Sequence, residues 1–458
     1  MRYLPHTPSD IARMLTTIGA PSVEALFSQI PEKLRAKRPL ELGPALDEAS
    51  LLAHLSELAG KSRAAVAEGS LSFLGAGLTP HHVATAVDAQ LTRAEWYTSY
   101  TPYQPEISQG TLQAVFEFQT IAAELLGLPV ANASMYDGST ACAEAILMAR
   151  RLSGDNHAHT VLSDGLHPHY RETADTYLSG LHPAAEQVFA RAQLDPATGR
   201  TDPKSLEAAL TREHGSAGCV LVQSPNQFGV VEDLATLSAI AHKHNALFVA
   251  VTTEPVAFGV LRSPGTEGAD IACGEGLGLA FGPQLGGPGV GLFAAKSEHV
   301  RAMPGRLVGE TVDKAGRRGF VLTLATREQH IRREKATSNI CTNTGLMALA
   351  FTINLCLLGR VGFRQLAELN LAKAEYAKKK LTALSGFSQR FSGPTFNEFA
   401  LRVRGGNAHA AVETLAQRGI FAGVVPPGEP DTIVLAVTER HRREDIDALA
   451  KALNEVCV

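Results

Sequence analysis

Between about Ser70 and Ser297, short apolar runs alternate with segments whose apolar residues recur at helical spacing. Strands are expected at Thr160–Ser163, Gly218–Gln223, Leu247–Thr252, Asp270–Cys273 and Gly289–Ala295, and helices at Thr111–Leu126, Ser139–Leu152 and Asp233–His244. Strands that are apolar along their whole length predict a mainly parallel sheet covered by helices on both faces. Ligands of such sheets bind beyond the carboxyl ends of the strands, so the polar residues after each strand are candidates for a site.

The whole chain is predicted to have three parts: a helical arm at 1–69, a large α/β domain at 70–316 and a small α+β domain at 317–458. In the arm, Thr7 and Asp10 form a capping-box pattern before a helix that Gly19 ends. The arm holds few large apolar residues, so we expect it to wrap a partner or a neighbouring domain. The expected elements of the small domain are helices at 342–358, 363–384 and 443–454 and strands at 396–403 and 432–438.

Composition excludes several classes of protein. A net charge of −4, with 45% hydrophobic and 19% charged residues, is typical of a globular protein without the basic field that nucleic acid requires. The six cysteines form no CxxC pair, which favours buried free thiols in a reducing compartment over a metal site. The N-terminus has no apolar signal core, and we identify no run of about 20 apolar residues that would span a bilayer. We therefore expect a cytoplasmic protein with no metal, nucleic-acid or membrane ligand.

The order of strands and loops is typical of the large domain of an enzyme that uses pyridoxal phosphate (PLP), yet the lysine is missing. Such an enzyme carries PLP on a lysine amine, expected here in the Gly-rich stretch Asp270–Gly291. No lysine occurs between Lys243 and Lys296, and Lys296 comes one strand too late. The aspartate expected against the pyridine nitrogen is replaced by Val251-Thr252. Either the chain does not use PLP, or it is half of an enzyme whose lysine lies on another chain.

One candidate binding site is an anion cup at the start of an expected helix. Gly138, Ser139 and Thr140 offer the backbone N–H and hydroxyl groups that a phosphate needs. Simple capping of the helix by Asp137 or Ser139 is the commoner use of such a sequence. His167 follows a strand at the position where PLP folds place a ring against the pyridine, and a satisfied polar residue is an equally good interpretation.

A second candidate is the segment Trp96–Gln109, the Tyr-rich loop, which contains the only tryptophan and three of the eight tyrosines. Pro102 and Pro105 predict an extended path, and aromatic and amide groups on a loop suit an interface or the side of a pocket. Rings that merely cover the sheet are the alternative, which we prefer for Trp96. The basic segment, Arg327–Asn343, is either a solvated charged helix or a contact for an anionic partner or a subunit.

These segments together resemble the glycine cleavage system P protein, and in particular subunit 1 of its split form. The specific motifs are His6–Leu15, Ser72–Gly77, Trp96–Gly110, Ala131–Asp137 and Thr326–Asn343. The resemblance covers essentially the whole chain and implies a fold-type-I PLP architecture. In the split family the two homologous halves are separate chains of an α2β2 heterotetramer, and the PLP lysine lies on the other half. One departure is Gly276–Pro283, where the family pattern leads us to expect a more polar loop.

The resemblance implies an oxidoreductase of the decarboxylating glycine dehydrogenase type. With PLP on subunit 2, glycine is decarboxylated and its aminomethyl group passes to the lipoyl arm of the H protein. This chain, inactive alone, would supply one side of the partner's active site through Tyr97, Tyr100, Tyr103 and Gln104. The residues Gly138, Ser139, Thr140 and His167 would persist as a vestigial cup that binds no cofactor.

Two other functions stay open from the sequence. The chain could be a pseudoenzyme that only stabilises or regulates a lysine-bearing PLP enzyme, in which case the hydroxyls of the Tyr-rich loop have no role. It could also be a stand-alone PLP decarboxylase that uses Lys296 or Lys243, which requires a lysine where the strand order does not put one.

Overall fold

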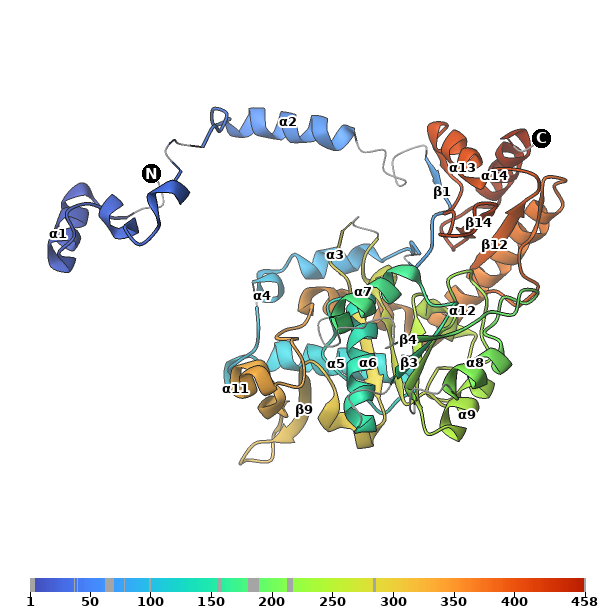
Figure 1. The fold of residues 1–458 in the computed structure, drawn as a ribbon, viewed down its shortest axis with the longest axis horizontal. Coiled ribbons are helices and arrows are strands. Elements are labelled where there is room, and N and C mark those ends of the chain that lie inside the picture. Colours follow the sequence, from blue (N-terminus) through green and yellow to red (C-terminus); the bar gives the residue numbers. More distant parts are fainter. Residues whose placement is uncertain are drawn as a thin grey trace. The chain divides into compact units, whose positions relative to one another are not determined.

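The structure, a computed structural model, describes residues 5–36, 38, 40–61, 70–77, 79–98, 100–154, 159–179, 189–211, 217–282 and 286–456 (Figure 1). The contacts within the chain divide it into two units, Met1–Ala64 and Ala65–Val458.

The N-terminal unit is helical, as expected. Its helices are α1 (Pro8–Ile18), η1 (Glu24–Phe27), η2 (Glu32–Leu34) and α2 (Glu48–Gly60). The capping box at α1 is confirmed, because the Thr7 and Asp10 side chains each accept the other residue's backbone N–H. Gly19 ends the helix with a φ of 71°. Neither α1 nor α2 has a buried residue, so this unit has no core of its own among its described residues.

The second unit is built around a seven-stranded sheet with the order β2-β8-β7-β6-β5-β3-β4. The strands are β2 (Val130–Ala131), β3 (His159–Ser163), β4 (Phe189–Ala192), β5 (Ala217–Gln223), β6 (Leu247–Thr252), β7 (Ile271–Glu275) and β8 (Gly291–Ala295). Strands β3 to β7 pair in parallel, whereas β8 is antiparallel to β7 and β2. The mainly parallel sheet is therefore confirmed. The sequence did not predict β2 and β4, which are short.

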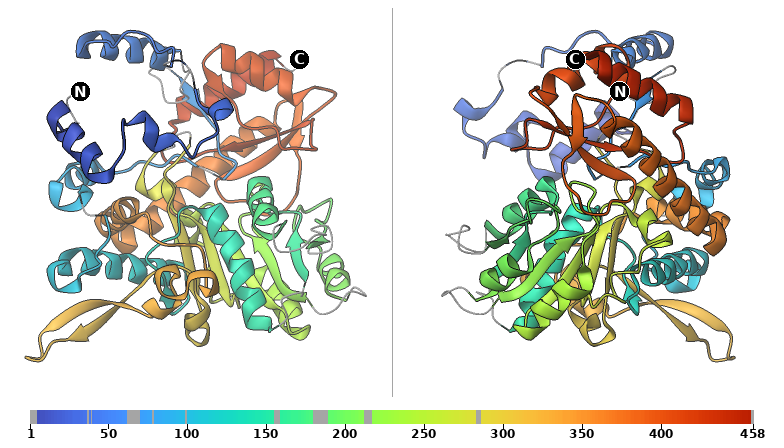
Figure 2. Two further views of the ribbon diagram at one scale, coloured as in Figure 1. Left: turned by 60° about the vertical axis from the view of Figure 1, so that its left-hand side comes forward. Right: turned by 90° about the vertical axis from the view of Figure 1, so that its right-hand side faces the viewer.

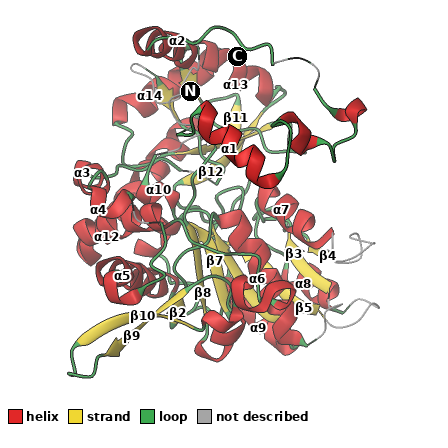
Figure 3. Cartoon of the chain, turned by 90° about the vertical axis from the view of Figure 1, so that its left-hand side faces the viewer, coloured by secondary structure: helices red, strands yellow, loops and turns green. Residues whose placement is uncertain are grey.

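Helices cover both faces of this sheet (Figures 1 and 3). Along β5, Val220 and Val222 join one apolar core while Cys219 and Leu221 join the other, as the two-residue period of a strand requires. The first core includes residues of α5 (Gln109–Leu126), α8 (Pro203–Leu210), α9 (Leu234–Lys243) and α12 (Gly345–Thr382). The second includes residues of α6 (Gly138–Ser153) and α7 (Pro168–Ser179).

The segment α12 consists of two helices that meet at a kink, which agrees with the two helices expected at 342–358 and 363–384. Gly359 has the non-helical angles φ 59° and ψ 179°, which mark the break between the two predicted halves. Among the described residues, α12 is the one helix long and apolar enough to cross a membrane by length and composition. Core helices of soluble proteins meet the same criterion, and Ala348, Ala350 and Phe351 of α12 lie in the core against the sheet.

The C-terminal part contains a three-stranded antiparallel sheet with the order β11-β12-β14. Its elements are β11 (Phe387–Gln389), β12 (Glu398–Val403), α13 (Ala408–Gln417), β13 (Ile420–Phe421), β14 (Thr432–Ala436) and α14 (Arg443–Val456). The short strand β1 (Leu71–Ser72) pairs in parallel with β13, and Phe73 is buried in this C-terminal core. The predicted boundaries after residues 69 and 316 stay a prediction.

An antiparallel hairpin of β9 (Leu307–Val312) and β10 (Arg318–Thr323) extends from the body of this unit (Figure 2). The sequence did not predict it, because the arginines around β10 looked like part of a charged loop. Its turn reads Asp313-Lys-Ala-Gly-Arg, in which Gly316 adopts a φ of 76° and Asp313 accepts the N–H of Arg317. Such a Gly turn between apolar runs is a hairpin signal that we missed.

A buried imidazole joins three distant segments of this unit. His81 lies 3.0 Å from both Glu254 Oε2 and Glu439 Oε2, and its side chain is 1% exposed. Burial lowers the pKa of His81, but attraction to and hydrogen bonds with Glu254 and Glu439 outweigh it and raise the pKa from 6.5 to about 10. Burial raises the pKa of Glu439, but His81 outweighs that effect and lowers it to about 2. A charged His81 between two carboxylates is the consistent state near neutral pH.

Replacing His81 with Asn should destabilise the chain by about 3–5 kcal/mol, because it leaves two carboxylates buried without their cation. The raised pKa of His81 stabilises the fold fully below pH 6.5, and this contribution is lost between pH 6.5 and about 10. The native chain should therefore lose stability over that range and His81→Asn should lack this component. Thermal unfolding followed by circular dichroism at several pH values measures both effects.

The neighbouring His82→Asn is the matched control, because the exposed His82 contacts Glu439 through its backbone N–H. Equal melting temperatures for the two variants would contradict a charged His81.

Candidate functional site

A polar cleft of about 660 Å³ lies where β7 ends and α6 begins, and we call it the strand-end cleft. Its lining includes Ala76, Asp137, Ser139, His167, Tyr170 and Glu275. It lies at the edge of the sheet where the sequence placed a ligand, because the carboxyl ends of parallel strands converge there.

The start of α6 is an anion cup that the chain's own carboxylates occupy. Asp137 caps the helix and accepts the N–H groups of Ser139 at 2.8 Å and Thr140 at 2.9 Å. Glu275, at the end of β7, accepts the N–H of Gly138 at 2.9 Å. Both hydroxyls also donate to Asp137, from Ser139 to its side chain and from Thr140 to its carbonyl. The N–H groups that a phosphate would use are thus already bonded.

Glu275 accepts three backbone N–H groups in the strand-end cleft. One oxygen accepts the N–H groups of Leu277 and Val290, and the other accepts that of Gly138. Burial raises the pKa of Glu275, and the nearby Asp137 raises it further, although these backbone bonds act in the opposite direction. Glu275 was not among the residues predicted from the sequence, although an acidic residue directly after an apolar strand is a signal for such a group.

His167 lies in the strand-end cleft but is held by backbone contacts. Its Nε2 donates to the Ala76 carbonyl at 2.8 Å, and its Nδ1 accepts the N–H of His169 at 3.2 Å. Burial lowers the pKa of His167, which agrees with a neutral ring. Gly77 fits beside the ring with a φ of 95°, and a Cβ there would lie 3.0 Å from it. His167 thus behaves as a satisfied polar residue.

The residues present do not fit a PLP Schiff base. Of the described residues that line the strand-end cleft, none is a lysine. Lys296 pairs with Asp270, which precedes β7 and so lies at the opposite end of that strand from Glu275. Lys243 pairs with Glu207. The carboxylate nearest the end of β6, Glu254, is bonded to His81 and to Asn397 at 2.9 Å. The stand-alone decarboxylase hypothesis therefore has no lysine in position.

The less polar stretch Gly276–Pro283 has a structural reason as far as the structure describes it. Residues Leu277–Ala280 form the short helix α10, in which Leu277, Leu279 and Ala280 are buried in the core beside α12. Pro283 lies outside the described residues.

The Tyr-rich loop exposes its three tyrosines to solvent. Tyr97 is 59% exposed, Tyr100 77% and Tyr103 63%, and Gln104 is exposed as well. The loop includes the end of the short helix α4 (Ala94–Tyr97) and all of η3 (Pro105–Ile107), and its last residue, Gln109, begins α5. Trp96 is half-buried, in a hollow lined also by Phe118 of α5 and Leu346 of α12, so it lies by helices where we expected the sheet.

The basic segment forms a series of short turns where a charged helix was one expectation. These are η7 (Ala325–Arg327), α11 (Gln329–Arg332) and η8 (Arg333–Lys335). The Arg327 guanidinium donates to the carbonyls of Met303 and Gly305, and burial lowers its pKa. The segment meets the Tyr-rich loop in a second cleft of about 770 Å³, the loop cleft. Its lining includes Tyr103, Arg306, Glu328, His330, Arg333 and Cys341.

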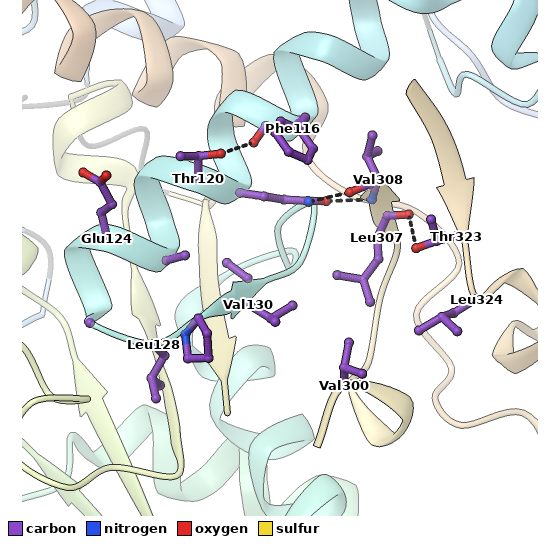
Figure 4. A pocket seen from close by; sticks show the side chains of 15 residues that line it. Phe116, Thr120, Glu124, Leu128, Val130, Val300, Leu307, Val308, Thr323 and Leu324 are labelled. Atoms are coloured by element: carbon purple, nitrogen blue, oxygen red, sulfur yellow. Dashed lines mark hydrogen bonds between the residues drawn. The ribbon is translucent and has the colours of Figure 1, made fainter. Parts of the chain in front are cut away.

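Among the described residues, one further groove and the cysteines were considered as candidate binding sites. A groove of about 730 Å³ at the base of the hairpin is lined mostly by apolar side chains such as Leu128, Val300 and Leu307 (Figure 4). Cys142, Cys219 and Cys273 are buried free thiols, and Cys457 lies outside the described residues. No group of three His, Cys, Asp or Glu side chains within the described part of the chain could hold a metal ion.

Comparison with known proteins gives the same fold and a family. The model of the glycine cleavage system P-protein family matches residues 1–453. A probable glycine dehydrogenase (decarboxylating) subunit 1 of Sorangium cellulosum is 52% identical over 459 residues, covering 99% of each chain. The corresponding protein of Rhizorhabdus wittichii is 50% identical over 461 residues, again with 99% of each chain covered. A crystal structure of glycine decarboxylase (P-protein) in inhibitor-bound form superposes with a TM-score of 0.87, at 43% identity and full coverage of both chains.

More distant structures include a sphingosine-1-phosphate lyase of Burkholderia pseudomallei (TM-score 0.65, 17% identity over 91% of this chain and 92% of that one). The architecture is that of the fold-type-I PLP-dependent enzymes. Within that class, the chain belongs to the glycine cleavage system P-protein family and corresponds over its full length to subunit 1. The subunit number implies a two-subunit P protein with a partner chain.

The close packing at the cup predicts the effect of one added methyl group. A Cβ at Gly138 would lie 2.1 Å from Tyr170 Oη and 2.8 Å from the Glu275 backbone nitrogen. Gly138→Ala should therefore destabilise the chain by about 1–3 kcal/mol through overpacking. Gly110 also lies in the first turn of a helix, but its Cβ would meet no atom within 4 Å. Gly110→Ala should be neutral or stabilise by up to about 1 kcal/mol.

Urea unfolding of both variants and the native chain measures the difference. Equal stability of the Gly138 and Gly110 variants would show that the cup is loosely packed.

Proposed function

We propose that this chain works with a lysine-bearing subunit 2 as the decarboxylating glycine dehydrogenase of the glycine cleavage system. The complex decarboxylates glycine and transfers the aminomethyl group to the lipoyl arm of the H protein. The observation that carries the proposal is the state of the strand-end cleft in a chain that matches subunit 1 relatives over 99% of its length. Its anion cup is filled by Asp137 and Glu275, and its lining offers no lysine among the described residues.

In this proposal PLP belongs to subunit 2, in an α2β2 heterotetramer that we expect in the cytoplasm. When bound there, PLP supplies the electron sink for decarboxylation. This chain supplies surface to that site. An exposed group of Tyr97, Tyr100 and Tyr103 is unusual for a free protein surface and common at interfaces, where a ring gives apolar contact and its hydroxyl a hydrogen bond.

The competing proposal is that this chain is a pseudoenzyme scaffold. The same exposed rings would support it if their only role is to bind the partner subunit. The two differ in the hydroxyl groups. Docking requires the rings and their apolar area, whereas a share in the active site also requires at least one hydroxyl, or the Gln104 amide, near the reacting groups.

Mixing the two subunits tests the division of labour. Glycine–bicarbonate exchange with H protein should be near zero for either chain alone and appear on mixing, because neither chain carries both parts of the site. Borohydride reduction of the active mixture should label a lysine of subunit 2. A stoichiometric pyridoxyl-lysine on this chain, or full exchange by this chain alone, would overturn the proposal.

Single Phe replacements of Tyr97, Tyr100 and Tyr103 separate catalysis from docking. Each removes only a hydroxyl, so subunit assembly should survive. At least one variant should lose about 10-fold in turnover, equivalent to about 1.4 kcal/mol of transition-state stabilisation. Steady-state kinetics of the reconstituted complex measure this loss. Tyr376→Phe is the control, because the Tyr376 hydroxyl donates to Asp447 on α14, outside the loop. Normal turnover in all three loop variants would favour the scaffold.

A further inference from the structure

Arg306 is a buried cation in the lining of the loop cleft. It follows the turn residue Gly305, which has a φ of 73°, and precedes β9. Its side chain is 4% exposed, and its backbone carbonyl accepts the N–H of Ala133 at 2.9 Å. The residue is therefore fixed in the body of the second unit while its side chain reaches the Tyr-rich loop.

The Arg306 guanidinium contacts both the Tyr-rich loop and the basic segment, which are far apart in the sequence. Nη1 donates to the hydroxyls of Thr101 at 3.1 Å and Thr342 at 3.4 Å. The guanidinium carbon lies 5.2 Å from the centroid of the Tyr103 ring, within the range of a cation–π contact. Glu328 Oε2 is 3.6 Å from Nε, too far for a hydrogen bond.

These contacts hold the exposed middle of the Tyr-rich loop. Within the described part of the chain, the hydrogen bonds that join residues 100–104 to segments outside the loop are those of Thr101 with Arg306 and Thr342. Tyr103 itself is 63% exposed, and the buried Arg306 guanidinium lies against its ring.

Stability alone gives little reason for this arrangement. The cost of burying a cation is offset only by close, well-directed partners. Replacing a buried ion pair with apolar residues therefore often leaves the stability of a protein unchanged or higher. Among the described residues, Arg306 Nε has no hydrogen-bond partner, and the carboxylate oxygen that pairs with it, Glu328 Oε2, lies 3.6 Å away. A planar guanidinium can both donate along its edge and stack on a ring, which a lysine ammonium cannot do in the same way.

We propose that Arg306 is a positioning residue, which fixes Thr101 and Tyr103 so that the Tyr103 hydroxyl reaches the partner's active site. The inference rests on the proposed function and deepens it. Arg306 acts through the loop, so its removal should lower turnover without weakening assembly and should change the order of the loop in this chain alone.

The kinetic test uses the reconstituted two-subunit enzyme. Arg306→Gln should lower kcat about 10-fold and change KM for glycine by less than about 2-fold, because misplacing a group by about 1 Å suffices for such a loss. Arg306→Lys should not restore activity. In a Tyr103→Leu background, Arg306→Gln should add less than about 2-fold, since both act through one ring. Independent, multiplying losses or normal turnover of Arg306→Gln would overturn the inference.

A second readout needs no activity. Trp96 is the only tryptophan of the chain and lies in the same loop. Acrylamide quenching of its emission in the full chain should rise in Arg306→Gln as the loop loosens, and unchanged quenching would contradict the inference. Arg318→Gln is the matched control, because Arg318 stacks on Phe320 at 4.9 Å in the hairpin and should affect neither readout. If Arg306→Gln folds poorly, Thr101→Val is the second variant, because it removes the hydroxyl that accepts from Arg306. It should produce the same kinetic pattern. Normal turnover of Thr101→Val would contradict the positioning role of Arg306.

The two proposals fail in different ways. Absence of exchange after mixing with subunit 2 refutes the proposed function whatever Arg306 does. Exchange on mixing, together with normal kcat in Arg306→Gln, refutes only the positioning role.

Discussion

The hydrogen bonds of the half-buried Glu275 carboxylate, at the end of β7, determine the state of the strand-end cleft. It binds three backbone N–H groups, of Gly138, Leu277 and Val290, at 2.8–2.9 Å. An anion satisfies the partial positive charge of a helix N-terminus, and here the anion is part of the chain. A phosphate brought to the same N–H groups would have to displace Glu275 and approach Asp137. At this edge of the sheet, the N–H groups that could bind a phosphate are thus already bonded to carboxylates of the chain itself.

In the proposed function, the surface that meets the partner subunit is therefore the loop cleft and not the strand-end cleft. The Tyr-rich loop and the basic segment lie far apart in the sequence, yet both line the loop cleft, and Arg306 contacts both. Their exposed rings and charged groups are features that a partner chain could use and that a monomer has no reason to keep. In the proposed function, this chain contributes by placing side chains at the partner's site, and the packed sheet holds the loops that carry them.

Much of the fold could be predicted from local pattern. Strands such as Gly218–Gln223 and Leu247–Thr252 were found because buried parallel strands are apolar at every position. The helix cap at Thr7 was found because a capping box involves residues only three positions apart. The hairpin β9–β10 was missed, since few of its residues are buried and its arginines looked like part of a charged loop. The two halves of α12 were predicted as separate helices, and the non-helical angles of Gly359 mark the junction between them.

The sequence by itself determined that this chain cannot carry a Schiff-base lysine in the Gly-rich stretch, because no packing can supply an amine that the residues lack. It also determined the mainly parallel sheet, through patterns that act over a few residues, whereas the fold-type-I architecture was implied by the family resemblance. Only the tertiary structure decided that Glu275 fills the cup, 137 positions from Gly138, and that Arg306 reaches Thr101 across 205 positions. Such contacts depend on the order in which strands pair and on how loops close between them, and neither is written in the local spacing of side chains.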